Sequence, residues 1–171
     1  MAISYVEDIA SEYYRLKGYL VSRSIKYQVP RAEAGKKASG WKDIDILALN
    51  EREALVIECK SFTGVKKAED MAKELLTNFR YAEKYYVEKH PLFKNKDIRK
   101  ILVVDFAVKK VDDILKKNDI EVYHLDALMK DFLTFLKTKL KDAKVGKEDH
   151  PMTRTLIFLL NWGFLKNLEE I

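Results

Sequence analysis

The segment of residues 40–62 constrains the fold of this chain most strongly, because it contains two apolar runs separated by one short polar stretch. The runs at residues 44–49 and 54–61 are rich in aliphatic residues, and runs of this length and composition predict β-strands. Asn50-Glu51-Arg52-Glu53 supplies a tight turn between them. We therefore predict a β-hairpin here, within a strongly apolar sheet.

Three charged residues interrupt this apolar hairpin. Asp45 opens the first strand, and Glu58 and Lys60 lie late in the second. Side chains two residues apart on a strand point to the same face, so we expect Glu58 and Lys60 to share a face, with Asp45 brought beside them by the hairpin. Because charges against a core are costly unless they are paired or bind a metal ion, the pattern indicates a functional site. The alternative is an exposed pair of Glu58 and Lys60, with Asp45 as a turn residue.

The rest of the chain alternates helical periodicity with short β-favouring runs. Consecutive strands joined by tight turns pair antiparallel, whereas strands joined through helices pair parallel. The order therefore predicts an α/β fold, with a mixed sheet that combines a three-strand antiparallel meander and parallel strands, flanked by helices on both faces. Beyond the hairpin we predict helices over residues 3–17, 66–89, 110–117, 126–144 (with Asp126 as N-cap) and 152–168, and strands over residues 19–30, 100–106 and 121–125.

Length and composition indicate a single globular domain in a reducing compartment. The chain has 171 residues, and 47% of them are apolar, which is enough for a substantial core. Cys59 is the only cysteine, so no internal disulfide can form, and no N-terminal signal pattern or membrane-spanning apolar run is visible. We therefore expect a cytoplasmic protein. A single glutamine beside abundant Lys and Glu is typical of thermophiles.

A polar stretch at residues 145–151 precedes the last helix. We expect a main domain over residues 1–145 and a C-terminal helical extension over residues 146–171. The apolar stripe of this extension would pack on the core, form the interface of a homodimer, or attach a further domain or subunit.

The excess positive charge of the chain is concentrated in one segment. Residues 23–42 contain six basic residues against Glu33 alone, a difference that equals the net charge of +5 for the whole chain. A basic segment just before the carboxylate-bearing strand suits a phosphate-rich partner, and DNA is the partner that we expect; a solvated loop without a partner is the alternative. The basic residues are Arg23, Lys26, Arg31, Lys36, Lys37 and Lys42.

The first helix, the three strands and the Asp-x12-Glu-x-Lys spacing of Asp45, Glu58 and Lys60 resemble the PD-(D/E)XK nuclease superfamily. This superfamily includes restriction endonucleases and archaeal Holliday junction resolvases. The resemblance covers residues 3–125 and leaves the C-terminal helices outside. It implies a restriction endonuclease-like fold and a metal-dependent DNA endonuclease that hydrolyses phosphodiester bonds, with restriction-like or structure-selective substrates.

The resemblance also assigns roles to individual residues. Asp45 matches the motif aspartate, although the proline that precedes it in the motif is absent, and Glu58 and Lys60 match the motif acid and lysine. The superfamily implies that Asp45, Glu58 and the backbone carbonyl of Cys59 bind Mg²⁺, for which Mn²⁺ can substitute. Asp43 is the alternative to Asp45, but Asp45 directly abuts the apolar run of the strand.

Many members of the superfamily carry a further acid on the first helix. Glu7 matches it by its spacing from Gly18, and Glu12, on a different face of the helix, is the alternative. The resemblance implies that Glu7 joins the catalytic set of Asp45, Glu58 and Lys60. The chemistry agrees with this set, because a bound cation activates water and offsets charge on the phosphate, while a lysine orients water or stabilises the transition state.

The cysteine, the histidines and the remaining candidate residues do not show the spacing of a metal-binding or catalytic motif. The side chain of Cys59 is expected to point into the core as a small apolar group. Asp105 is expected to form a cap or turn after its strand, with a place in the cleft of the acid cluster as the alternative. Tyr85 and Tyr86 are expected in the core or at an interface rather than as platforms for stacked bases. The isolated histidines are His90, His124 and His150.

Two other functions fit the same residues. One is a catalytically silent nucleic-acid-binding module on the nuclease fold, because a fold does not guarantee an activity. The other is a nuclease that acts on RNA.

Overall fold

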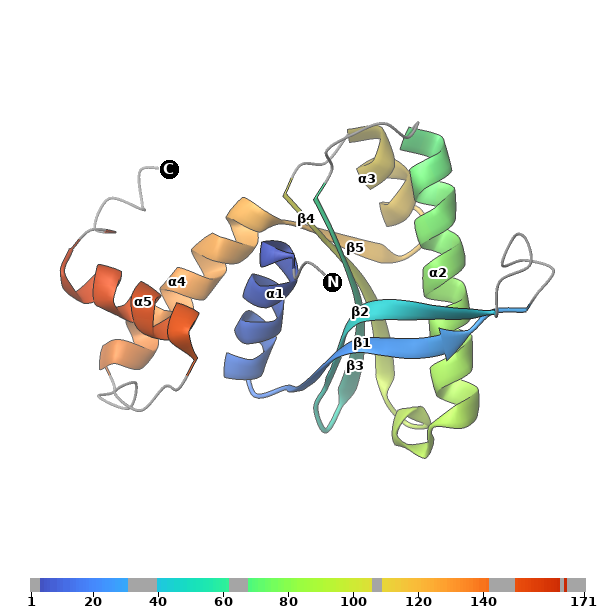
Figure 1. Ribbon diagram of the computed structural model, residues 1–171, viewed down its shortest axis with the longest axis horizontal. Coiled ribbons are helices and arrows are strands. Elements are labelled where there is room, and N and C mark those ends of the chain that lie inside the picture. The colour runs from blue at the N-terminus through green and yellow to red at the C-terminus, as the bar shows by residue number, and fades with distance from the viewer. Residues whose placement is uncertain are drawn as a thin grey trace. The chain divides into compact units, whose positions relative to one another are not determined.

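The chain folds around a five-stranded sheet, as the computed structural model shows (Figure 1). The structure describes residues 4–30, 40–61, 68–105, 109–141, 150–163 and 165. The elements follow in the order α1 (Tyr5–Leu16), β1 (Leu20–Gln28), β2 (Trp41–Leu49), β3 (Glu53–Lys60), α2 (Ala68–Lys89), a 3-10 turn η1 (Pro91–Phe93), β4 (Asp97–Val104), α3 (Lys109–Lys116), β5 (Ile120–His124), α4 (Leu125–Lys141) and α5 (Pro151–Asn161).

The sheet has the mixed topology that the sequence predicts. Its strands lie in the order β1-β2-β3-β4-β5, with β1, β2 and β3 antiparallel and β3, β4 and β5 parallel. The side-chain oxygen of Asn50 accepts hydrogen bonds from the backbone N–H groups of Arg52 and Glu53, both at 2.8 Å, and closes the turn between β2 and β3. The predicted α/β class, with a meander and parallel additions, is confirmed.

Helices cover both faces of the sheet, as predicted. α2 and α3 lie on one face and α1 on the other (Figure 1). Leu75, Phe79 and Tyr86, from the apolar stripe of α2, join Val56 of β3 and Leu102 of β4 in one buried cluster. The buried residues of α1 are Val6, Ala10, Glu12, Tyr13 and Tyr14.

The boundaries of the strands differ from the prediction by a few residues, and two of these differences concern the hairpin. β2 begins at Trp41, because its ladder with β1 extends to the pair of Gln28 and Trp41, so Asp45 lies in the middle of the strand rather than at its start. Glu53 is the first residue of β3 rather than part of the turn, because it pairs with Asp97 of β4. Pairing with neighbouring strands, which local sequence does not reveal, extends both strands.

β1 and β2 are interrupted at one position. Ser24 of β1 has a φ of 52°, and the register of the two strands skips Ser24 and Asp45 between the flanking pairs. A positive φ at a residue with a side chain is uncommon and breaks the regular alternation of a strand. On one side of this position Ile25 and Ile44 pack with the α2 core, whereas on the other side Arg23 reaches α1. Asp45 therefore sits at a break in the sheet.

The chain divides into two compact units, Met1–Leu125 and Asp126–Ile171. The expected division of the chain into residues 1–145 and 146–171 stays a prediction. α4 begins directly after β5, so Asp126 lies in the first turn of α4 and not at the predicted N-cap. In this first turn the carboxylate of Asp126 accepts a hydrogen bond from the backbone N–H of Ala127 at 2.8 Å.

α5 ends at Asn161, earlier than the predicted residue 168. Trp162 and Gly163 form a turn after it, and Gly163 has a φ of 76°, a conformation that glycine adopts without strain and that commonly ends helices. Phe158 and Trp162 are exposed and stack with their ring centroids 5.3 Å apart. The expected homodimer, or contact with a further subunit, stays a prediction. Among the described helices, none has the length and apolar content needed to cross a membrane.

Candidate active site

The charged ends of Asp45, Glu58 and Lys60 meet on the sheet. Lys60 Nζ lies 2.6 Å from Glu58 Oε2 and 3.1 Å from Asp45 Oδ2. Glu58 and Lys60 share a face because they lie two residues apart on β3, and the hairpin of β2 and β3 brings Asp45 beside them. The structure therefore brings together the three residues that the sequence pattern singles out.

Asp45 lies where β2 and β3 separate. The register of the two strands runs to the pair of Ile46 and Ile57 and does not continue to Asp45 and Glu58. Asp45 Oδ2 instead accepts a hydrogen bond from the backbone N–H of Cys59 at 2.7 Å. A side-chain carboxylate thus replaces the main-chain acceptor that a regular ladder would provide for this N–H group.

Glu58 is an ionisable side chain in a position with almost no access to water. It is 2% exposed, and its Oε1 atom has no hydrogen-bond partner among the described residues. Burial raises the pKa of Glu58 to about 7; Lys60 opposes this rise and the charge of Asp45 adds to it. A buried carboxylate oxygen without a donor is costly, and a cation is a partner that would satisfy it.

Lys60 connects the buried acid to solvent. Its side chain is 38% exposed, compared with 21% for Asp45. Burial alone would lower the pKa of Lys60, but the charges of Glu58 and Asp45 outweigh that effect and raise the pKa above its ordinary value. Lys60 is therefore a cation at neutral pH, held between two carboxylates.

Glu7 of α1 lies beside the same cluster. The pKa of Glu7 is raised, first by burial and then by the charge of Asp45. Arg23 opposes this rise, because its guanidinium donates a hydrogen bond to Glu7 at 3.3 Å. Glu12, the alternative on α1, is buried and accepts two hydrogen bonds from Arg15, both at 2.8 Å. Glu7 is therefore coupled to Asp45, whereas Glu12 is held by Arg15.

The basic residues of segment 23–42 have different surroundings. Arg23 pairs with the acids of α1, and Lys42 Nζ donates a hydrogen bond to Asn78 Oδ1 of α2 at 2.7 Å. Lys26 is exposed and stands opposite Asp43, the alternative motif acid, which is also exposed. Their contacts with nucleic acid stay predictions. Outside the described residues lie Arg31, Lys36 and Lys37.

A second polar cluster follows Lys60 at the ends of β3 and β4. Tyr5 of α1 and Ser61 both donate hydrogen bonds to Asp105 Oδ2, the bond from Ser61 at 2.8 Å. The backbone N–H of Asp105 reaches the carbonyl oxygen of Lys60 at 3.4 Å. The sequence predicts a cap or turn role for Asp105 and misses its link to Tyr5. The available signal is its place after a buried parallel strand, because the carboxyl ends of neighbouring parallel strands meet at one edge of the sheet.

The oxygen atoms of the cluster fit a hard divalent cation. The described residues include no group of three or more His, Cys, Asp or Glu side chains that could hold a metal ion. Mg²⁺, however, is commonly bound by one or two carboxylates, completed by water and substrate phosphate. Asp45 and Glu58 provide two such carboxylates, and the unpartnered Oε1 of Glu58 provides a free acceptor.

The remaining residues that the sequence analysis considered are buried or paired within the fold. Cys59 is buried, as predicted, and burial raises the pKa of its thiol. His124 Nε2 lies 2.9 Å from Asp112 Oδ2, which pairs it with an acid of α3. Tyr86 is buried in the core, whereas Tyr85 is only half-buried.

Several solved structures are similar to this chain in fold, and two of them are compared with it. The small subunit of the heterodimeric restriction endonuclease R.BspD6I is 16% identical, with 97% of this chain and 84% of that chain covered and a TM-score of 0.50. A protein of unknown function is 11% identical, with 94% of this chain and 97% of that chain covered and a TM-score of 0.53. This likeness concerns the fold alone, and it confirms the restriction endonuclease-like architecture. No curated protein sequence matches the chain.

The nuclease-related domain family matches residues 4–126, from just before α1 to the first turn of α4. The match includes all of β2 and β3 and therefore Asp45, Glu58 and Lys60. Together with the fold, it confirms the predicted relation to the PD-(D/E)XK nucleases and supports a nuclease-type function. The chain belongs to the nuclease-related domain family.

Proposed function

We propose that this chain is a metal-dependent endonuclease that hydrolyses the phosphodiester bonds of DNA. The observation that carries the proposal is the buried Glu58, whose Oε1 has no partner among the described residues and whose Oε2 meets Lys60 beside Asp45. Strongly perturbed acids beside a second acid and a lysine are typical of catalytic sites, because a purely structural cluster gains nothing from an unsatisfied charge.

Asp45, Glu58 and the backbone carbonyl of Cys59 are the ligands that we propose for Mg²⁺ or Mn²⁺. All three supply hard oxygen donors, which these ions prefer. When bound, the ion lowers the pKa of a coordinated water molecule and offsets negative charge on the phosphate.

Lys60 supplies positive charge at the solvent-facing side of the acid pair. Negative charge builds up on the phosphate oxygens as the attacking water oxygen adds to phosphorus. An ammonium group fixed at that place stabilises the transition state more than the ground state, which is what accelerates a reaction. Because Lys60 is cationic beside Glu58 and Asp45, we assign it this electrostatic role and the orientation of water.

Glu7 acts from α1 as a positioning residue for water. Its carboxylate is partly buried and coupled to Asp45, so it can accept a hydrogen bond from a water molecule on that side. In the reaction, the water gives up one proton to solvent as its oxygen bonds to phosphorus, the ester P–O bond breaks, and the leaving oxygen takes up one proton from solvent. Arg23, which pairs with Glu7, fixes the direction of this carboxylate.

The basic residues near β1 and β2 support nucleic acid as the substrate. Lys26 is exposed, and the sequence places further lysines and arginines in the same segment. Such charge contacts phosphates without reading base sequence. The similarity in fold to a restriction endonuclease subunit supports DNA over RNA.

A cleavage assay with a matched pair of variants tests the proposal. Plasmid, branched, single-stranded and RNA substrates are incubated with Mg²⁺ or with chelator. We expect cleavage of DNA only with the metal ion, and a loss of about 10²-fold or more in Asp45→Asn, because a ligand of the ion is lost.

Asp43→Asn is the control, because Asp43 lies two residues away on the same strand and is exposed. It should cleave at the rate of the unmodified protein. Equal activity of Asp45→Asn and the unmodified protein would overturn the site assignment, and preferential cleavage of RNA would overturn the choice of substrate.

A catalytically silent binding module is the second candidate. The observation that favours it is the position of Lys60, whose Nζ contacts both carboxylates and so neutralises part of the acid pair without a metal ion. In that case DNA binding would persist in chelator, no substrate would be cleaved, and Mn²⁺ would not raise the melting temperature of the protein.

A further inference from the structure

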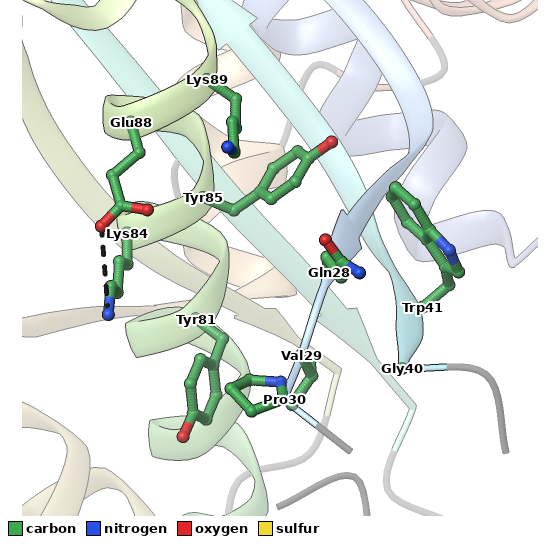
Figure 2. A pocket seen from close by; sticks show the side chains of 10 residues that line it. All are labelled: Gln28, Val29, Pro30, Gly40, Trp41, Tyr81, Lys84, Tyr85, Glu88 and Lys89. Atoms are coloured by element: carbon green, nitrogen blue, oxygen red, sulfur yellow. Dashed lines mark ion pairs between the residues drawn. The ribbon is translucent and has the colours of Figure 1, made fainter.

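A pocket of about 420 Å³ lies between α2 and the paired ends of β1 and β2 (Figure 2). Gln28 and Trp41 line it from the strands, and Tyr81, Tyr85 and Lys89 line it from α2. Its volume falls in the range of about 300–1,000 Å³ that is common for small-ligand sites. None of the acids of the catalytic cluster lines it, so it is a separate feature of the described structure.

Three aromatic residues, Trp41, Tyr81 and Tyr85, line the pocket. The ring of Tyr85 extends from α2 toward Gln28 and Trp41, as Figure 2 shows. The centroids of Trp41 and Tyr85 lie 6.0 Å apart with the planes at 77°, an edge-to-face contact that covers at most one face of each ring. Trp41 is 49% exposed. The indole of Trp41 therefore exposes a large surface to solvent while its contact with Tyr85 fixes its orientation.

The surroundings of Tyr85 make this aromatic surface rigid. Its ring also contacts the rings of Tyr86 and His90, with centroids 5.7 Å and 5.9 Å away. Tyr86 is fully in the core and stacks on Phe93 at 5.3 Å. A rigid aromatic surface loses little conformational entropy when a planar ligand stacks on it.

Gly40 fixes the strand end that carries Trp41. A Cβ atom at this position would lie 2.0 Å from the carbonyl oxygen of Val29, so only glycine allows the ends of β1 and β2 to approach this closely. The backbone N–H of Val29 donates a hydrogen bond to the carbonyl oxygen of Gly40. The described part of the rim at Val29 and Gly40 is therefore held by a close backbone contact.

One strand, β2, carries both Trp41 of the pocket and Asp45 of the acid cluster. Trp41 and Asp45 are four residues apart on β2, a distance of about 13 Å along an extended strand. At a rise of about 3.4 Å per nucleotide in a stacked strand, this distance is about four nucleotides.

We propose that this pocket binds one unpaired nucleobase of a DNA strand whose backbone passes the Asp45–Glu58–Lys60 cluster, with the base stacked on Trp41 and Tyr85. The inference rests on the proposed function, because that function brings a nucleic acid strand to β2. A nucleobase is planar and aromatic with a polar edge, and the pocket offers ring faces together with the amide of Gln28.

The charge of the pocket agrees with a nucleotide as the occupant. Lys84 and Glu88 pair with each other at 3.9 Å, a contact dashed in Figure 2. Lys89 lines the pocket without an ion-pair partner among the described residues. An ammonium group beside a stacked base can meet the phosphate attached to it. The rings that would stack on the base and the ammonium group that would meet its phosphate therefore line the same pocket.

Fluorescence of Trp41 tests the proposal directly. The chain has two tryptophans, so Trp162→Phe leaves Trp41 as the only one. This variant is titrated in chelator, so that no cleavage occurs, with a short thymidine oligonucleotide, with the matching blunt duplex, and with an oligonucleotide of the same length made of abasic sites. We expect quenching by the single strand, and little by the duplex or the abasic strand, because only the first presents free bases for stacking.

Affinity measurements on a matched pair complete the test. Trp41→Ala should weaken single-strand binding about ten-fold, in the range reported for loss of one stacked base. Trp41→Phe should retain most of the affinity, and Trp162→Ala, an exposed tryptophan outside the pocket, should retain all of it. Equal quenching by the abasic strand, or equal loss in Trp41→Ala and Trp162→Ala, would overturn the inference. Quenching without metal-dependent cleavage would overturn the proposed function and leave the base pocket intact.

Discussion

Two clusters of charged residues lie at opposite ends of β3 and differ in how well their charges are satisfied. At the start of the strand, Arg99 bonds Glu121 through two nitrogens, both at 2.7 Å, and bonds Glu53 at 2.9 Å. Tyr19 donates a further hydrogen bond to Glu53. At the end of the strand, Glu58 keeps a buried oxygen without a partner among the described residues.

The pKa shifts of the two acids on β3 have opposite signs. The pKa of Glu53 is lowered, first by the hydrogen bond from Tyr19 and then by Arg99, so its surroundings favour the charged form. The pKa of Glu58 is raised to about 7, first by burial, so its surroundings disfavour that form. A cluster that satisfies its charges stabilises the fold, whereas a cluster that leaves a charge unsatisfied can bind a cation.

The largest expected effect is on catalysis. Lys60→Met should lower the rate of Mg²⁺-dependent DNA cleavage by about 10²–10³-fold, because the charge facing the phosphate is lost. Lys100→Met is the matched control, since Lys100 lies on the neighbouring strand and pairs with Glu83 at 3.2 Å. Single-turnover cleavage rates measure both. Similar rates for the two variants would mean that the cluster at the end of β3 has no catalytic advantage over an ordinary ion pair.

The next effect is an unusual gain in stability. Glu58→Gln should raise the free energy of unfolding of the metal-free protein by about 1–2 kcal/mol at pH 8, because a buried charge is removed. The folded-state pKa of Glu58 lies above its ordinary value, so the protonated acid stabilises the fold below pH 4.5, and this contribution is lost as the pH rises through about 7. The gain from the substitution should therefore vanish toward pH 4.5. Urea unfolding in chelator at a series of pH values measures it.

Addition of Mn²⁺ sharpens the same experiment. The ion should raise the melting temperature of the unmodified protein and leave that of Glu58→Gln unchanged, because binding to the folded state alone stabilises it. A loss of stability in Glu58→Gln at pH 8 would show that Glu58 is an ordinary structural acid.

A smaller effect of opposite sign is expected at the other end of β3. Arg99→Met should lower the free energy of unfolding by about 1 kcal/mol, a value limited by solvent because the Arg99 side chain is 40% exposed. The cleavage rate should stay unchanged, since Arg99 belongs to the satisfied cluster. Urea unfolding and the cleavage assay on the same preparation measure both. A loss of activity without a loss of stability would contradict the division between the clusters.

The smallest effect concerns Glu53. Glu53→Gln should lower the free energy of unfolding by less than about 1 kcal/mol at neutral pH, as for other partly exposed pairs. The folded-state pKa lies below the ordinary value of 4.5, so the contribution of Glu53 is present above that value and is lost as the pH falls through the lower pKa. The loss of stability in Glu53→Gln should shrink in acid, as should the gain in Glu58→Gln, but the two differences have opposite signs at pH 8. Differences of the same sign at pH 8 would remove the contrast between the two ends of the strand.

Local patterns in the sequence are enough to predict the secondary-structure elements and to single out the residues of the candidate site. Apolar runs of strand length around Asn50, and the helical stripe of α2, are local patterns, and local patterns suffice to predict a hairpin, a mixed sheet and flanking helices. The two-residue spacing of Glu58 and Lys60 fixes a shared face, because alternation along a strand is a property of the backbone.

Which of these charged groups find hydrogen-bond or ion-pair partners depends on the packing of the strands and helices. The break at Ser24 and Asp45, the bond from Cys59 N–H to Asp45, and the unpartnered oxygen of Glu58 depend on where neighbouring strands separate. The links of Arg99 to Glu121 and of Tyr5 to Asp105 span long stretches of sequence. Contacts of this kind leave no periodic trace in the chain, because the geometry of packing, not the order of residues, sets which charged groups are satisfied and which are left for a ligand.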